Sequence, residues 1–114
     1  MDGNTIINNE RYDIQMIKGD TLSFGLEIEG LDQDLDSAYF SCAISMASEQ
    51  PLFVKTLGDG IEKVDQTHYR VRVAPADTAE LSPMIYRYDF QIGVNGDVFT
   101  LIYGNFTVLP EVSN

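Results

Sequence analysis

The sequence predicts an all-β sandwich of about seven or eight antiparallel strands, and three observations support this fold class. Apolar and polar side chains alternate along most of the chain, which is typical of strands with one buried and one exposed face. Turn-forming residues interrupt the alternation at short intervals. With 114 residues, 44% of them hydrophobic, the chain fits a single domain, residues 1–114, with a packed core.

The alternation defines the expected strands. Four segments show it most clearly: Leu22–Ile28, Phe40–Met46, Tyr69–Val73 and Tyr86–Val94. Shorter or less regular strands are expected at Asp13–Ile17, Leu52–Leu57, Ile61–Val64 and Val98–Val108. One short helical turn is expected near 75–81, capped by Asp77, and the ends 1–10 and 110–114 are expected to fray.

Asn95-Gly96 lies between two apolar runs, which is the strongest short signal for a β-hairpin. In the favoured register, a two-residue turn puts Phe99, Leu101 and Tyr103 on the core side, and a bulge near Gly104 restores the phase of the strand. The alternative is a three-residue turn that includes Asp97. That register leaves the same three side chains outside as an apolar patch, so they are a possible interaction surface.

Tyr86 opens a clear strand and follows Leu81-Ser82-Pro83. A tyrosine at this place can turn its hydroxyl back to a backbone group a few residues upstream, which is the tyrosine corner of immunoglobulin-like sandwiches. The alternative is an ordinary half-buried strand aromatic. The corner favours an immunoglobulin-like fold.

Composition excludes several functions. Eighteen acidic and seven basic residues give a net charge of −11, which disfavours nucleic acid and anionic membrane surfaces as partners. No apolar run is long enough to span a bilayer, and the polar start of the chain predicts no signal peptide. One cysteine and one histidine exclude an intrachain disulfide and most His-based catalysis. We expect no enzyme, no cofactor and no small-molecule substrate.

Candidate chemical groups have simpler explanations. Asp32, Asp34 and Asp36 resemble the start of a calcium loop, but the sixth and twelfth positions hold Ser37 and Ala43 instead of glycine and glutamate. A solvated acidic loop is therefore expected, and no metal site is predicted.

Other titratable side chains also favour structural roles. Cys42 lies on the apolar side of its strand and is expected to be a buried, inert thiol, and His68 is expected near a strand end. Arg70, Arg72 and Arg87 lie on outward positions of two strands that could be neighbours. They are expected to form ordinary cross-strand pairs with acids such as Glu27, Glu29 and Asp89.

Several segments, in order and spacing, resemble the N-terminal immunoglobulin-like domain of phage baseplate upper proteins and its short prophage-encoded relatives. The segments are Ile17–Thr21, Leu35–Ala38, Pro75–Leu81, Tyr86–Ile92 and Thr100–Val108, and the resemblance covers roughly residues 14–112. It implies a β-sandwich that attaches to other tail or baseplate proteins, or to itself. It supplies no catalytic residue.

The resemblance therefore favours a non-catalytic structural and interaction module of a phage or prophage tail, made in the bacterial cytoplasm. Larger relatives carry further domains that hold receptor-binding proteins, and these are not expected within 114 residues. The alternative function is a glycan-binding module for host attachment that uses surface tyrosines.

Overall fold

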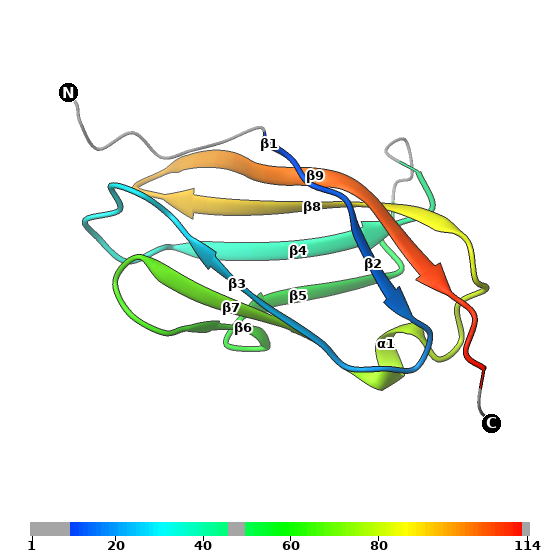
Figure 1. Ribbon diagram of the computed structural model, residues 1–114. Coiled ribbons are helices and arrows are strands. Elements are labelled where there is room, and N and C mark those ends of the chain that lie inside the picture. Colours follow the sequence, from blue (N-terminus) through cyan, green and yellow to red (C-terminus); the bar gives the residue numbers. More distant parts are fainter. Residues whose placement is uncertain (1–9, 46–49, 113–114) are drawn as a thin grey trace.

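The computed structural model describes residues 10–45 and 50–112, which form nine strands and one short helix (Figure 1). The strands are β1 (Glu10–Arg11), β2 (Ile14–Ile17), β3 (Leu22–Glu27), β4 (Ser37–Ala43), β5 (Phe53–Leu57), β6 (Gly60–Lys63), β7 (His68–Val73), β8 (Ile85–Val94) and β9 (Asp97–Leu109), and the helix is α1 (Pro75–Thr78). The all-β prediction is confirmed. The predicted frayed ends lie largely outside the described residues, as does Met46, the predicted end of one strand.

The strands form two layers. The first is β1 and β2 beside β9, followed by β8, β4 and β5, and the second is β6, β7 and β3. A two-residue pairing of β5 with β6 joins the layers into one hydrogen-bonded path. This arrangement is an immunoglobulin-like sandwich, in which β3 to β9 are strands B, C, C′, D, E, F and G. The pairings of β1 and β2 with β9 and of β5 with β6 are parallel, whereas the sequence predicts only antiparallel strands.

An aromatic cluster joins the layers at the centre of the core. The Phe40 ring in β4 lies 5.2 Å from the Tyr88 ring in β8, 5.8 Å from Phe24 in β3 and 6.1 Å from Phe106 in β9, measured between centroids. In antibody domains this place holds a strand-C tryptophan packed on a disulfide between strands B and F. Here the Phe24–Phe40 contact links the two layers, and the other ring contacts lie within one layer; each is worth about 0.5–1.5 kcal/mol beyond its buried area.

The β8–β9 hairpin turns at Asn95 and Gly96, whose φ angles of 52° and 86° fit a two-residue type I′ turn. The register begins as the favoured prediction has it, with Ile92 opposite Phe99. The predicted bulge near Gly104 is wrong. Gln91 pairs with Thr100 and Phe90 pairs with Ile102, so the extra residue is Leu101. The early bulge puts both Leu101 and Ile102 in the core, 5% and 8% exposed.

Gly104 instead lies beside Tyr12 and Asp13, which connect β1 to β2 where both strands run parallel to β9. A Cβ atom on Gly104 would meet the Tyr12 carbonyl oxygen at 2.8 Å and the Asp13 carboxylate at 2.6 Å. Hydrogen bonds hold this segment against the sheet: the Tyr88 hydroxyl donates to the Tyr12 carbonyl, and the Asn105 N–H donates to the Asp13 carboxylate at 3.0 Å. Only glycine leaves room for this close approach of two backbones.

The connection from α1 to β8 carries the tyrosine corner. The Tyr86 hydroxyl donates to the Ser82 carbonyl at 2.6 Å, the type of contact that the sequence predicts. Leu81 is half-buried against the core, whereas Pro83 is exposed in the turn. Asp77 caps the helix, but from inside it: Ala74 holds the N-cap position and Asp77 is the third helical residue. The Asp77 carboxylate accepts from the Ala74 N–H at 2.7 Å.

Candidate functional site

The patch formed by Phe99, Leu101 and Tyr103 is not a contiguous exposed surface. Leu101 is buried, Phe99 is half-buried against the core, and Tyr103 is half-buried on the opposite, outward side of β9. The bulge at Leu101 causes this division, because it changes the side of the strand on which later residues lie. A docking surface must therefore be sought elsewhere.

The predicted neighbourhood of the three arginines is also wrong. Arg70 and Arg72 lie on β7, and Arg87 lies on β8, but β7 and β8 belong to different layers. None of the three forms an ion pair with another described residue. Two separate candidate surfaces result, one on the outside of each layer.

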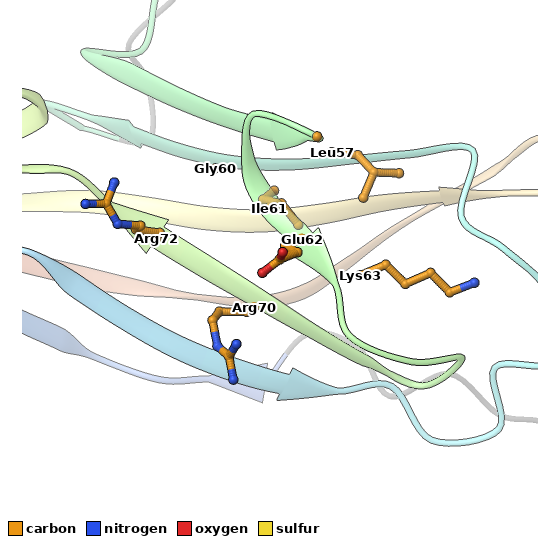
Figure 2. A pocket seen from close by; sticks show the side chains of 8 residues that line it. Leu57, Gly60, Ile61, Glu62, Lys63, Arg70 and Arg72 are labelled. Atoms are coloured by element: carbon orange, nitrogen blue, oxygen red, sulfur yellow. The ribbon is translucent and has the colours of Figure 1, made fainter.

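The first candidate is the outer face of the β6–β7–β3 layer together with the adjoining end of β5. We call it the arginine face and define it by Arg70, Arg72, Glu62 and Leu57. A hollow of about 560 Å³ lies here between the end of β5, β6 and β7 (Figure 2). The positions beside the arginines on β3 are Gly25 and Ser23, so no large side chain covers them there. Both guanidinium groups are free to bind a ligand on this face.

Charge is unevenly distributed around this hollow. The neighbouring Lys63 extends away from the arginines in Figure 2, and its ammonium contacts the Asp34 carboxylate at 2.6 Å. That hydrogen bond raises the pKa of Lys63. Glu62, opposite Arg70 in the β6–β7 register, is the acid on the face itself. The face thus combines two unpaired arginines and an exposed Leu57 on a chain of net charge −11.

The second candidate is the outer face of the β4–β8–β9 layer, around Arg87 and Asp89. A hollow of about 210 Å³ forms there beside the small side chains Ser41 and Ala43. The Nε atom of Arg87 is buried without a hydrogen-bond partner. Burial also raises the pKa of Asp89. The register puts Asp89 beside Tyr103 on β9, and Tyr39 lies on the same side of β4 and is 45% exposed.

The remaining predicted groups lie outside both faces. Cys42 is buried, which raises the pKa of its thiol to about 12, so it is not a nucleophile. His68 lies at the start of β7, where its Nδ1 contacts the Asp65 carboxylate at 2.8 Å. That contact raises the pKa of His68 and lowers that of Asp65.

Residues 10–45 and 50–112 contain no group of three His, Cys, Asp or Glu side chains that could hold a metal ion. In the acidic loop, Asp34 pairs with Lys63, and the Asp36 carboxylate accepts from the Gly96 N–H at 3.4 Å. Within the same ranges, no helix is long and apolar enough to cross a membrane.

The sequence did not indicate which residues lie beside the arginines in the two hollows. Glu62 and Gly60 join Arg70 and Arg72 only because β6 pairs with β7, and the pairing of distant strands leaves no local signal. The outward position of each arginine could be predicted from strand alternation, whereas its neighbours could not.

Comparison with known proteins supports the fold. No model of a known protein family matches the chain, and no curated protein matches it. Its structure is similar to part of a proposed glycoside hydrolase from Bacteroides vulgatus ATCC 8482, with a TM-score of 0.52 and 15% identity, over 88% of this chain and 17% of that one. It is also similar to the extracellular domain of the voltage-gated sodium channel β4 subunit, studied as parallel homodimers in cell–cell adhesion.

The second likeness has a TM-score of 0.45 and 11% identity, and it covers 95% of this chain and 98% of that chain. It is too weak to carry an argument. The first likeness, at 15% identity, bears on the fold alone, and this chain corresponds to only 17% of the length of that protein. The strand order of the two layers defines the chain as an immunoglobulin-like β-sandwich domain.

Proposed function

We propose that this chain is a non-catalytic structural and protein-interaction module of a phage or prophage tail or baseplate. Two lines of argument support the proposal. The ordered segments between Ile17 and Val108 resemble the N-terminal domain of baseplate upper proteins, which attaches to the tail. The fold presents exposed sheet faces on which a protein partner can dock. The setting is then the virion tail, after synthesis in the bacterial cytoplasm.

The single observation that carries the interaction role is the arginine face. Arginine is enriched at protein interfaces, and its planar fork binds carboxylates through two hydrogen bonds. Arg70 and Arg72 have no such partner among the described residues, and they lie next to the exposed Leu57. On a strongly acidic chain, such a face orients the approach of a partner with an acidic surface.

The proposal is tested by co-purification with a tail hub or baseplate protein encoded beside this chain. The double variant Arg70→Glu with Arg72→Glu should lose the partner, because carboxylates would then face carboxylates. Lys18→Glu is the charge control, since Lys18 lies in the turn after β2 and does not line this hollow. Equal recovery of the partner with the double variant and the control would contradict the proposed role of the face.

A glycan-binding module is the second candidate, and one observation favours it. Tyr39 and Tyr103 lie on the same outer face as Asp89 and Gln91, so aromatic rings flank polar groups that could bind sugar hydroxyls. Glycan-array binding that is lost in Tyr39→Ala, and is unaffected by the arginine double variant, would favour this alternative. Absence of glycan binding together with loss of the partner in the double variant would favour the interaction module.

A further inference from the structure

The β3 strand has a free edge. Among the described residues β3 pairs only with β7, so it ends the hydrogen-bonded path of the sandwich. Its layer contains three strands, whereas the facing layer contains β1 and β2 together with β9, β8, β4 and β5. In Figure 1, β3 runs alongside β7. A layer that is narrower than its partner leaves part of the core face uncovered at this edge.

The backbone groups on this edge can be assigned. The Ile28 N–H donates to the Thr67 carbonyl at 2.8 Å, so Ile28 points its backbone groups toward β7. Backbone groups alternate in direction along an antiparallel strand. The N–H and C=O groups of Ser23, Gly25 and Glu27 therefore point to the free edge. They present the row of donors and acceptors that an added strand would bind.

The side chains beneath this edge are incompletely covered. Leu22, Phe24 and Leu26 point inward from β3 but are only half-buried. Their partners on β7 are fully buried: Tyr69, Val71 and Val73 are 1%, 0% and 0% exposed.

A hollow of about 260 Å³ opens at the same place, between the two layers. It is lined by Glu10, Tyr12, Phe24, Gly25, Leu26 and Ile102. Its mainly apolar walls lie next to the unpaired backbone groups of β3. One extended segment could therefore fill the hollow with its side chains and form hydrogen bonds with β3 through its backbone.

The edge also lacks the features that keep sheet edges from pairing. Proteins usually protect such edges with lysine, proline or a bulge. Residues 22–27 contain no lysine and no proline, and their register with β7 runs without interruption. The outward residues Ser23 and Gly25 are small and uncharged, whereas Glu27 at the end of β3 and Glu10 beside the hollow are exposed carboxylates.

We propose that the β3 edge receives an extended segment of a partner protein as an added strand. Apolar side chains at alternate positions of that segment would fill the hollow over Phe24 and Leu26, and lysine or arginine near its ends would lie close to Glu27 and Glu10. Charge complementarity favours such a partner over a second copy, which would bring another −11 to the interface. This inference deepens the proposed function and rests on it, since it names how the partner binds.

The test uses the full chain and a labelled synthetic peptide, Lys-Val-Thr-Val-Thr-Val-Lys, with binding measured by fluorescence anisotropy. Gly25→Pro removes a donor that faces the free edge and leaves the β7 ladder intact. Gly25→Ala is the matched control, because a Cβ there meets the Tyr69 carbonyl at an ordinary 3.8 Å. We expect Gly25→Pro to weaken binding at least about tenfold and Gly25→Ala to change it less than about twofold, on the scale of lost interface hydrogen bonds.

A second measurement needs no variant, so it does not depend on whether Gly25→Pro folds. In the wild-type chain, the peptide should slow amide hydrogen exchange at Ser23, Gly25 and Glu27 and not at buried β7 amides. A peptide with glutamate in place of both lysines should bind more weakly. Equal binding of the peptide by the proline and alanine variants, or unchanged exchange at these amides, would overturn the proposal.

Two other occupants of the edge have their own signatures. Concentration-dependent dimers in sedimentation, abolished by Gly25→Pro, would assign the edge to a second copy and overturn the proposal. Peptide binding that appears only after removal of residues 1–9 would assign it to the chain's own N-terminal segment, with the same consequence. Because the arginine face lies on different residues, its double variant tests the proposed function even if the β3 edge binds nothing.

Discussion

Gly104→Ala is the substitution whose effect the structure defines most directly. The new Cβ would lie 2.8 Å from the Tyr12 carbonyl oxygen and 2.6 Å from the Asp13 carboxylate, whereas ordinary contacts begin near 3.4 Å. The segment that connects β1 to β2 would have to move by roughly 0.6 Å or more, the difference between these contact distances. Overpacking of this kind costs about 1–3 kcal/mol.

Movement of the segment that connects β1 to β2 would also weaken its hydrogen bonds to β8 and β9. The Tyr12 N–H donates to the Tyr103 carbonyl at 2.8 Å, and the Tyr88 hydroxyl donates to the Tyr12 carbonyl. Each such bond contributes about 0.5–1.5 kcal/mol. Because part of the strain can relax at the exposed Asp13, we expect a total loss of about 2–3 kcal/mol in the free energy of unfolding.

Urea and thermal unfolding measure this loss. At about 4 °C per kcal/mol for a domain of this size, the melting temperature should fall by about 8–12 °C. Gly58→Ala is the control, because Gly58 has φ of 89° and a Cβ there would meet nothing within 4 Å. It reports the backbone cost alone, about 1 kcal/mol. Equal melting temperatures for the two variants would refute the close approach at Gly104.

Three further predictions follow from single contacts. Tyr86→Phe should lower stability by about 1 kcal/mol in urea unfolding, because the Ser82 carbonyl loses its donor but water can replace it at this exposed residue; no loss would argue against the corner. Cys42 should resist thiol reagents until the chain is denatured, since burial raises its pKa to about 12, and rapid labelling of native protein would contradict its burial. Asp65→Asn should lower the pKa of His68 in an NMR titration. In the unaltered chain, the contribution of His68 to folding stability is lost as pH rises through the raised pKa of His68. The contribution of Asp65 is lost as pH falls through the lowered pKa of Asp65.

Much of the fold could be predicted because its signals are local. Period-two alternation located the main strands, and Asn95-Gly96 specified a turn that needs positive φ at both residues. Tyr86 indicated its own corner because the hydroxyl acceptor lies only four residues away. The sequence does not locate the bulge clearly. Leu101 and Ile102 are consecutive apolar residues, and either could have been the one that points inward.

The sequence alone determined which side chains can be buried and where the chain turns, because alternation and turn conformation depend on neighbouring residues. Tertiary structure decided which distant strands pair, since backbone hydrogen bonds form between any two strands that packing brings together. That choice separated Arg87 from Arg70 and Arg72, required glycine at position 104, and left one edge of β3 unpaired among the described strands. The candidate binding surfaces are products of these pairings, so they became visible only in the folded chain.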